Sequence, residues 1–592
     1  MTSEPSMEPT SEPAPAEIAA PTRPSPTGAV GASPGRWAVA AVIAAAAVVV
    51  AAGGAILLGS RPTPEALSYV PGDAAVVAEL RPDLPGDQLE KVGNFLAHFP
   101  GFKDQSTLSQ KLDETFARLT RSASDGSVDY QTQVKPWIAG PLFAAASIGA
   151  QDSGGRSGDV VLVASTDGTA SCAAVIQGTT STETDQGVAI VTSSDGTMAC
   201  ALQDRYGLLG TPAMVRAALD AHASHTGMDT VEQYRTARDT LGGDRLATLY
   251  VSKAGIEAGA LPSDLPSAMP LASGDVAAAL ARVPDWAMAG ISTEDDAVVA
   301  DLVTAPLPDA TPAASGSPLP TLPPARASRI APLLPSGTIA LAENHGTGVS
   351  VERAIAQLQA DPRAGAALGS VQSALGLLGG VDGLVGWVDD LGVAVVPDGS
   401  SATGGAVLLA VDEATAAAKA GQLKSLVGLL ALGGKATVST ETIDGVEVTL
   451  VEVDDVQSLV QSVGGAGGAT SIPSPALPAG TTIKLALASR GQAVLVGSES
   501  FVRQVLDTKA GASLADAPAY QHALSRAFAQ NVGQVYVAAA PLMTLATGSM
   551  PDADRASFST NVEPYLAPFD AVMVTTTLDH GAVRVRLVAT VQ

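Results

Sequence analysis

The sequence predicts an α+β protein with largely antiparallel sheets, arranged as two similar domains that follow one transmembrane helix. Three observations predict this organisation. One apolar run, Trp37 to Gly59, carries no charged side chain. Segments of residues 67–304 recur in the same order in residues 328–592. Short segments rich in β-branched residues alternate with Asp-Gly pairs, which are tight-turn signals between neighbouring antiparallel strands.

The 592-residue chain starts with a tail, residues 1–36, that is rich in Pro, Ser, Thr, Glu and Ala. We expect this tail to be disordered because it has almost nothing to bury. As a helix, residues 37–59 would span roughly 34 Å, enough to cross a hydrocarbon core of about 30 Å. The run exceeds the apolar core of a usual signal peptide, so an uncleaved signal anchor is favoured over cleavage between Ala51 and Ala55. Residues 60–66 then form a juxtamembrane linker.

Positive charges beside the apolar run favour a cytoplasmic tail. Arg23 and Arg36 precede the run, whereas Arg61 alone follows it closely. We therefore expect a single-pass protein of the cytoplasmic membrane, with residues 37–59 in the lipid bilayer and the C-terminal domains outside the cytoplasm. The formal net charge of −26 makes nucleic acid a poor partner, because acidic surfaces repel phosphate backbones. An envelope protein or a lipid is the partner class that remains.

The body of the chain repeats itself. GTPAMVRAALD, from Gly210, matches GSESFVRQVLD, from Gly497. PGDAAVVAEL, from Pro71, matches PSGTIALAEN, from Pro335. Matches that keep their order predict a tandem duplication, in which a Pro-rich linker over residues 305–327 joins a first α+β domain (67–304) to a second (328–592).

Within each copy, strands and helices have recognisable signals. Strand-length segments with β-branched residues cover 75–80, 160–165, 187–193 and 198–203. Asp-Gly pairs at 167–168, 195–196, 398–399 and 444–445 predict the turns between strands. Two matching helices are expected to start after Thr211, with Pro212 in the first turn, and after Ser498.

The chain has two cysteines, Cys172 and Cys200. If they pair, the disulfide suits an oxidising compartment, and closing a loop of this length would contribute roughly 3–4 kcal/mol to stability. The alternative is two separately buried thiols. The spacing alone does not choose between them.

An apolar run followed by ALSYVPGDAAVVAEL from Ala66, and later by Lys135-Pro136-Trp137, resembles the family called domain of unknown function 3352. The resemblance extends over most of residues 65–592. It implies a membrane-anchored bacterial protein of the cell envelope without assigned biochemistry, and it supplies no catalytic residues. The second copy departs from the pattern, because Val385-Gly386-Trp387 replaces the Lys-Pro-Trp triplet.

Two pairs of residues are weighed as candidate sites. His222 and His225 share a helix face and could begin a zinc site, but no third ligand is evident, and a solvated helix end is the favoured interpretation. Glu79 and Glu343 occupy equivalent places in the two copies. Acid–base chemistry would need one of them to be buried, and ion pairing at a strand end, with Arg81 beside Glu79, is favoured instead.

Trp137 and Trp387 begin matching strands, where we expect them to fill each core rather than form an exposed platform. Three acidic groups, at 294–296, 389–390 and 454–455, lack the spacing of a calcium loop and are interpreted as solvated faces.

Residues 364–387 form the least usual stretch of the body, with one charge and many Leu, Val, Ala and Gly residues. Burial between domains or against a sheet is the favoured interpretation, and a groove for an acyl chain is the alternative. The residues that would form this apolar ligand or interface surface are Leu368, Val371, Leu375, Leu378, Leu384 and Trp387.

Motifs for nucleophilic hydrolysis, phosphate binding, dinucleotide binding and metalloprotease chemistry are missing from the sequence. We therefore expect no catalytic residue, metal or cofactor. The favoured function is a non-enzymatic binding or scaffolding protein of the bacterial envelope. A carrier or sensor of a hydrophobic, lipid-like ligand is the alternative, and an envelope hydrolase with an unrecognised site is the third hypothesis.

Overall fold

A computed structural model provides the structure of the protein. It describes residues 65–103, 129–148, 158–176, 180–258, 283–306, 325–352, 382–432, 436–453, 483–548 and 550–592, with a few isolated positions between them. The expected tail, transmembrane run and juxtamembrane linker lie almost wholly outside this part of the chain. Among the helices in the described ranges, none is both long and apolar enough to span a bilayer.

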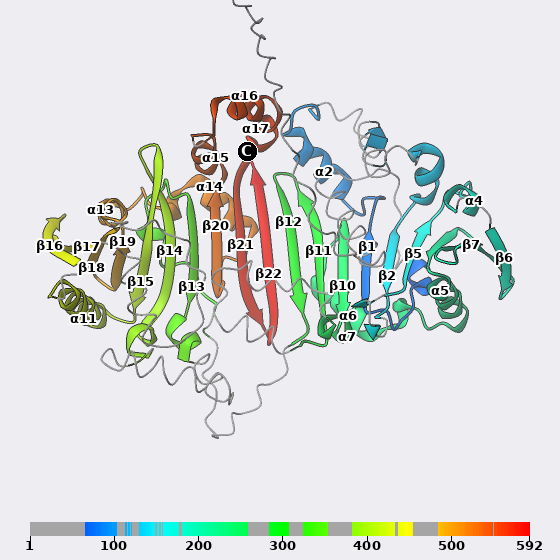
Figure 1. Ribbon diagram of the computed structural model, residues 1–592, viewed down its shortest axis with the longest axis horizontal. Helices are drawn as coiled ribbons and strands as arrows, with labels where there is room; N and C mark the ends of the chain where they lie inside the picture. The colour runs from blue at the N-terminus through cyan, green and yellow to red at the C-terminus, as the bar shows by residue number, and fades with distance from the viewer. Residues whose placement is uncertain are drawn as a thin grey trace, which may run out of the picture.

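One antiparallel sheet of 20 strands dominates the described structure (Figure 1). Ten strands come from the residues before the Pro-rich linker. From the outer edge to the centre they are β6 (Thr180–Asp185), β7 (Val188–Ser193), β8 (Ala199–Gln203), β9 (Tyr206–Gly210), β5 (Val160–Ser165), β2 (Leu142–Ala146), β1 (Val76–Leu80), β10 (Ala247–Ser252), β11 (Trp286–Glu294) and β12 (Ala297–Thr304). The expected α+β class with antiparallel strands is confirmed.

Ten further strands come from the residues after the linker, and we call the two sets the first and second halves. From the other outer edge to the centre they are β16 (Ala436–Ile443), β17 (Val446–Val453), β18 (Ile483–Arg490), β19 (Ala493–Gly497), β15 (Ser401–Ala410), β14 (Val388–Asp398), β13 (Ala340–His345), β20 (Gly533–Ala538), β21 (Phe569–Asp579) and β22 (Ala582–Val591). Each strand of one half therefore has a counterpart at the same place in the other half.

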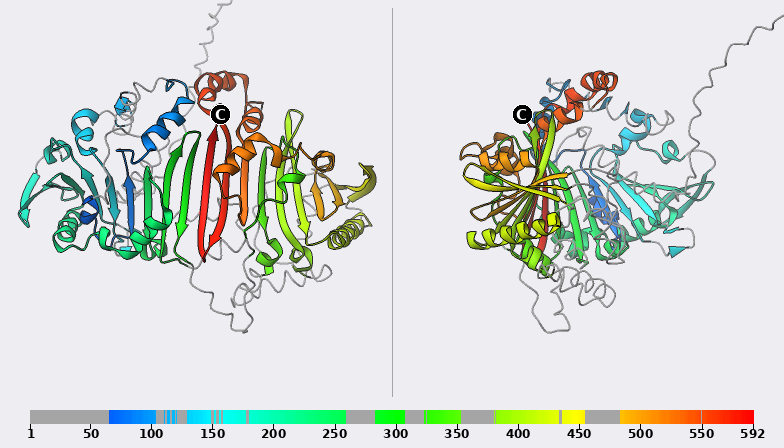
Figure 2. Two further views of the ribbon diagram at one scale, coloured as in Figure 1. Left: turned by 180° about the vertical axis from the view of Figure 1, so that it is seen from behind. Right: turned by 60° about the vertical axis from the view of Figure 1, so that its left-hand side comes forward.

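The halves meet where β12 pairs with β22, so the sheet continues across the centre without a break (Figure 2). Asp301 is opposite Arg586 in this pairing, and the two occupy matching places in DDAVVADLVT and HGAVRVRLVA. Arg586 Nε donates to Asp301 at 2.7 Å, and Arg245 forms a second ion pair with it at 2.8 Å. Asp301 is only 5% exposed, and these two arginines pair with the buried carboxylate.

Helices cover the same part of the sheet in each half and enclose its main core. The elements of the first half are η1 (Glu65–Tyr69), α5 (Pro212–Ser224), η5 (Met228–Thr230) and α6 (Glu232–Leu241), and their counterparts are η6 (Ala331–Leu333), α13 (Glu499–Asp507), η9 (Leu514–Asp516) and α14 (Pro518–Arg526). The further helices are α2 (Gln88–Ala97), α4 (Cys172–Val175), α7 (Lys253–Glu257), α11 (Glu413–Leu432), α15 (Ala539–Gly548), α16 (Asp552–Asn561) and α17 (Glu563–Leu566).

Helix ends and core contacts recur between the halves. Ser498 accepts a hydrogen bond from the Phe501 amide and caps α13. Thr211 is the N-cap residue of α5 and Pro212 lies in the first turn as expected, but the Thr211 side chain accepts no capping hydrogen bond. In both cores two tyrosine rings meet edge-on with centroids 5.2 Å apart. The pairs are Tyr234 with Tyr250 and Tyr520 with Tyr536.

A second, smaller core lies beside the outer strands of each half. In the first half Trp137 packs against the disulfide between Cys172 and Cys200, which ties the one-turn α4 to β8. In the first half α4 lies between β5 and β6, and in the second half the 20-residue α11 lies at the corresponding place between β15 and β16. Trp387 packs beside α11 against residues such as Ala416. Both tryptophans therefore contribute to cores.

Two details differ from the sequence-based expectations. Trp137 lies in a 3₁₀ turn, η4 (Lys135–Trp137), before β2 rather than in a strand, since Pro136 occupies that turn. Asp167-Gly168 leads from β5 into α4 rather than between two strands; the other three Asp-Gly pairs do join strands. Most of the expected apolar surface, including Leu368 to Leu378, lies outside the described residues.

Candidate functional site

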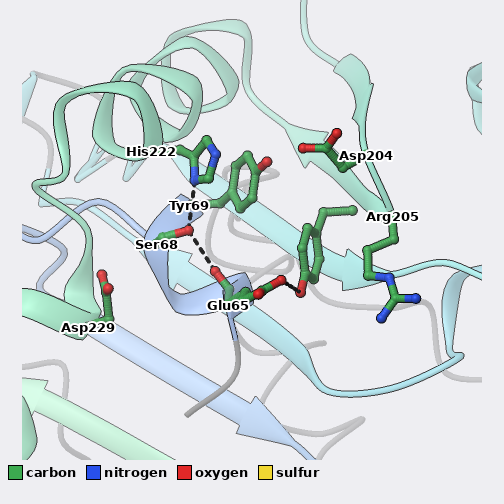
Figure 3. Close-up of a pocket in the computed structure, with 8 residues that line it drawn as sticks. Glu65, Ser68, Tyr69, Asp204, Arg205, His222 and Asp229 are labelled. Carbon is green, nitrogen blue, oxygen red and sulfur yellow. Dashed lines mark hydrogen bonds between the residues drawn. The ribbon is translucent and has the colours of Figure 1, made fainter. Parts of the chain in front are cut away.

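A hollow of about 700 Å³ opens beside the first described residues of the chain, and we call it the tyrosine pocket (Figure 3). Its residues come from η1, the β8–β9 turn, the end of α5 and η5. They are Glu65, Ser68, Tyr69, Asp204, Arg205, Tyr206, His222 and Asp229. Aromatic rings, carboxylates, a hydroxyl and a guanidinium thus converge on one space.

Local backbone features position these side chains. Asp204 has a φ of 54° in the tight turn that leads into β9, a conformation that aspartate tolerates better than most residues. His225 has a φ of 56° and ends α5, so His222 lies in the last turn of that helix. Gly227 contacts η1 so closely that a Cβ would lie 2.5 Å from the Ser68 carbonyl oxygen. This contact fixes η1 against η5.

Ser68, Tyr69 and His222 form the centre of the pocket. The His222 and Tyr69 rings stack nearly parallel, at 7°, with centroids 3.9 Å apart. His222 Nδ1 lies 2.8 Å from Ser68 Oγ, and Ser68 Oγ also donates to the Glu65 carbonyl oxygen at 2.6 Å. The serine hydrogen is therefore directed to the backbone carbonyl, which leaves His222 Nδ1 to act as the donor toward Ser68.

The two tyrosines are hard to ionise. Burial, with the negative charge of Asp204 beside it, raises the pKa of Tyr69 well above its ordinary value. Burial and the charge of Glu65 raise the pKa of Tyr206 to about 12, and Tyr206 Oη donates to a Glu65 carboxylate oxygen at 3.3 Å. Both hydroxyls therefore act as neutral hydrogen-bonding groups at physiological pH.

Two buried polar atoms of the pocket are poorly satisfied. Tyr69 is 1% exposed, and its Oη contacts the Asp204 carboxylate without a hydrogen bond of regular geometry. Asp229 Oδ1 is buried without a hydrogen bond in the described structure. Leaving such a group unpaired costs roughly 1–3 kcal/mol, so an atom like Asp229 Oδ1 at a hollow indicates a place for a ligand.

The histidines that were weighed as a zinc pair are not brought together. His222 is held by Ser68 and Tyr69, whereas His225 lies exposed at the helix end. The pocket also contains residues that the sequence analysis missed, including Glu65, Ser68, Tyr69 and Tyr206. The sequence does contain a signal, because Ser68 and Tyr69 differ from Pro332 and Leu333, which stand at the matching places before β13.

Glu79 and Glu343 do lie at matching places, and both are buried. Arg81 is 3.6 Å from Glu79, as the ion-pair interpretation expected. Burial raises the pKa of Glu79, although the charges of Arg238 and Arg81 oppose that effect. Glu343 is better satisfied, because it accepts hydrogen bonds from Ser328 Oγ, Gln534 Nε2 and two backbone amides.

One cluster could in principle hold a metal ion. Glu343, His345 and Asp390 are buried, with ligand atoms within 4.8 Å of one another. However, Arg326 and Arg329 both pair with Asp390, and His345 Nδ1 lies 3.1 Å from it. Burial would raise the pKa of Asp390, but His345 and Arg326 outweigh it and hold that pKa below its ordinary value. Cations already occupy the place that a metal would take, so the cluster is an ion network.

The acidic groups that were interpreted as solvated faces are in part ion-paired. Asp296 lies 2.9 Å from His522 and from Arg526, and burial of Asp296 is outweighed by these partners, which hold its pKa down. Asp389 and Asp390 pair with arginines as described above. The third group, at 454–455, lies outside the described residues.

Comparisons with known proteins place the chain in a family without giving it an activity. The chain belongs to the family described as Protein of unknown function (DUF3352), which matches residues 36–586. No curated protein matches the sequence. Crystal form I of TP0453 has 8% identity and a TM-score of 0.22, with 43% of this chain and 81% of that chain covered. Crystal form III has 9% identity and a TM-score of 0.21, with 43% and 82% covered. Similarity at these scores carries no argument here.

Proposed function

We propose that this protein is a non-enzymatic binding protein of the bacterial cell envelope, held outside the cytoplasmic membrane by residues 37–59. The observation that carries the proposal is the tyrosine pocket, where Asp229 Oδ1, buried without a hydrogen bond among the described residues, meets a set of convergent hydrogen-bonding groups. A binding pocket of several hundred Å³ with a few placed polar groups is typical of small-molecule sites.

The sequence would keep this pocket close to the membrane. Glu65 lines the pocket and comes six residues after Gly59, the last residue of the proposed span. Six residues of fully extended chain reach at most about 20 Å. A ligand of the tyrosine pocket would therefore be met near the outer surface of the bilayer.

Charge narrows the ligand class. Glu65, Asp204 and Asp229 supply three carboxylates, against the single guanidinium of Arg205. Carboxylates and a neutral tyrosine prefer a ligand with N–H or O–H donors and disfavour an anion. The favoured ligand is a small neutral or cationic molecule with several such donors, such as a sugar or an amine.

We further propose that the two halves arose by duplication of one unit. Equal strand order, matching tyrosine pairs and matching segments support this origin. Repeat-equivalent ion pairs support it too: Arg216 on α5 pairs with Glu183 on β6, and Arg503 on α13 pairs with Glu441 on β16. The common scaffold then leaves each half free to vary its pocket.

The binding proposal is tested with full-length protein in lipid nanodiscs. Glucosamine, N-acetylglucosamine and glucose 6-phosphate serve as cationic, neutral and anionic probes in calorimetric titrations. We expect glucosamine to bind most tightly and the sugar phosphate most weakly. Tyr69→Phe and Asp229→Asn should each weaken binding by about tenfold, or ~1.4 kcal/mol, and Asp220→Asn, on α5 outside the pocket, should not. Preferred binding of the phosphate, or binding of none of the probes, would contradict the proposal.

The membrane proposal has its own test. Protease added to intact cells should degrade the two halves, and a carbonate wash should leave the full chain in the membrane fraction. Protection of the halves in intact cells, or release of the chain by carbonate, would contradict it.

A serine hydrolase is the second candidate function, because Ser68 and His222 lie at hydrogen-bonding distance. The geometry favours binding instead. Ser68 donates to a backbone carbonyl, and no described carboxylate accepts a hydrogen bond from His222 to orient it. A fluorophosphonate probe that labels wild type but not Ser68→Ala would establish the hydrolase, and the absence of labelling is expected.

A further inference from the structure

The second half contains a hollow of about 600 Å³ at the place that corresponds to the tyrosine pocket. It is formed by η6, the β18–β19 turn and the end of α13, which are the counterparts of η1, the β8–β9 turn and the end of α5. Isolated β-bridges confirm that the two hollows lie at matching places. One bridge, Pro71–Gly227, joins the segments after η1 and before η5, and the other, Pro335–Ser513, joins the segments after η6 and before η9. We call this hollow the arginine pocket.

Its chemistry is opposite to that of the tyrosine pocket. Leu333 stands at the place of Tyr69, Ala493 at that of Tyr206, and Arg329 at that of Glu65. None of the described residues that line it carries a carboxylate, and most of them, such as Leu409, Leu495 and Val505, are apolar.

The pocket has an apolar floor and a cationic rim. Leu409, Leu495 and Leu506 are buried beneath it. At the rim, Arg490 is exposed and donates from Nη1 to the Leu506 carbonyl oxygen at 2.7 Å, and it forms no ion pair with any described residue. Arg329, in contrast, is paired with Asp389. Arg490 therefore offers an uncompensated positive charge next to an apolar surface.

The charge of the lining favours an anion. Although the formal net charge of the chain is −26, this hollow has no carboxylate in its described lining and has the guanidinium of Arg490 without an ion pair among the described residues, so it selects for a negative group. Guanidinium groups bind carboxylates and phosphates through paired hydrogen bonds, and the leucine and valine floor suits an alkyl chain.

We infer that the arginine pocket binds an anionic amphiphile, a molecule with one acyl chain and a carboxylate or phosphate head group. The alkyl chain lies along the floor formed by Leu409, Leu495 and Leu506, and the head group meets Arg490 at the rim. The inference goes beyond the proposed function, because it concerns a separate site and a ligand of opposite charge.

The test follows amide hydrogen exchange of the full chain in nanodiscs while soluble probes are added. Octanoate and octyl phosphate should protect the β18–β19 turn and η6. Acetate and inorganic phosphate, which lack the chain, should bind at least about tenfold more weakly, as should octylammonium, which carries the wrong charge. Protein-free nanodiscs measure the share of each probe that enters the lipid.

Two variants separate ligand binding from folding. Gln492→Glu keeps the size of the side chain and adds a negative charge at the rim, next to Arg329. Arg490→Gln removes the uncompensated charge. Each should weaken octanoate binding by about tenfold or more, whereas Arg503→Gln, on α13 outside the pocket, should leave it unchanged.

Stronger protection by octanoate than by octyl phosphate would identify a carboxylate head group, and the reverse would identify a phosphate. Protection by octylammonium equal to that by octanoate would overturn the inference. Unchanged binding in both folded rim variants, or equal binding of acetate and octanoate, would overturn it as well.

Discussion

The two halves of the sheet have the same strand order but present opposite chemistry at the same place. The tyrosine pocket has two tyrosine rings and three carboxylates, whereas the arginine pocket has an apolar floor and two guanidiniums. The same strand order is therefore compatible with two different pocket linings. Strand order depends on core positions such as the paired tyrosines, and pocket chemistry depends on a few loop residues that the core does not constrain.

The outer regions of the halves differ in a second way. A disulfide holds a helix of one turn in the first half, and a helix of 20 residues covers the same connection in the second. A short helix buries too little apolar surface to be stable alone, so a covalent link replaces packing. The comparison predicts that these regions respond differently to reduction.

The largest expected effect concerns the centre, where the halves meet. Asp301→Ala removes a buried carboxylate and leaves Arg245 and Arg586 without their shared partner. We expect the free energy of unfolding to fall by about 3–5 kcal/mol, measured by urea denaturation. Glu183→Ala, which breaks the exposed pair with Arg216, is the matched control and should cost no more than about 1 kcal/mol. Equal losses in the two variants would show that the junction is not held by this charge.

Removal of the disulfide should have the next largest effect. Replacing Cys172 and Cys200 by serine should lower the stability of the first half by about 3–4 kcal/mol on the loop-entropy argument. Amide hydrogen exchange should increase around α4 and β8 and stay constant around α11. An equal increase in the two halves would contradict the comparison of the outer regions.

The matched glutamates should respond differently to replacement by glutamine. Burial raises the folded-state pKa of Glu79 above its ordinary value of 4.5. The contribution of Glu79 to stability is therefore complete below pH 4.5 and declines as the pH rises from there through the raised pKa. Glu79→Gln should therefore flatten the decline and stabilise the protein at neutral pH. Glu343→Gln should instead destabilise it, because the new amide N–H₂ meets groups that donate to the carboxylate. Denaturation curves at several pH values measure both, and a destabilised Glu79→Gln would be the opposite of this expectation.

The smallest effect on stability is expected in the tyrosine pocket. Tyr69→Phe removes a hydroxyl whose contact with Asp204 is not a hydrogen bond of regular geometry, so the unfolding free energy should change by less than about 0.5 kcal/mol. A large loss, measured by the same denaturation assay, would indicate that the hydroxyl is part of the folded core and would remove it from the binding argument.

Much of the fold was predictable because periodic signals encode it locally. Strand segments such as 160–165, Asp-Gly turns and the starts of α5 and α13 follow from β-branched content, turn chemistry and capping. The structure shows that β12 pairs with β22, but no local signal states which strands of the two halves become neighbours. Pairing across the centre depends on contacts between residues far apart in sequence, such as Asp301 and Arg586.

The pocket was harder to predict than the fold. Its residues come from four separate elements, and His222 is the one among them that the sequence analysis names as a candidate. Ser68 and Tyr69 precede the first strand. A serine and a tyrosine at that place do not by themselves indicate a binding site. Their significance depends on the approach of α5 and η5, which the sequence pattern does not specify.

The central claim is that equivalent pockets on one repeated scaffold bind ligands of opposite charge. Amide hydrogen exchange of the full chain, recorded with glucosamine and then with octanoate, tests it most directly. The account predicts that glucosamine protects η1 and the β8–β9 turn only, and that octanoate protects η6 and the β18–β19 turn only. Protection of the same half by both probes, or of neither pocket by either probe, would contradict it.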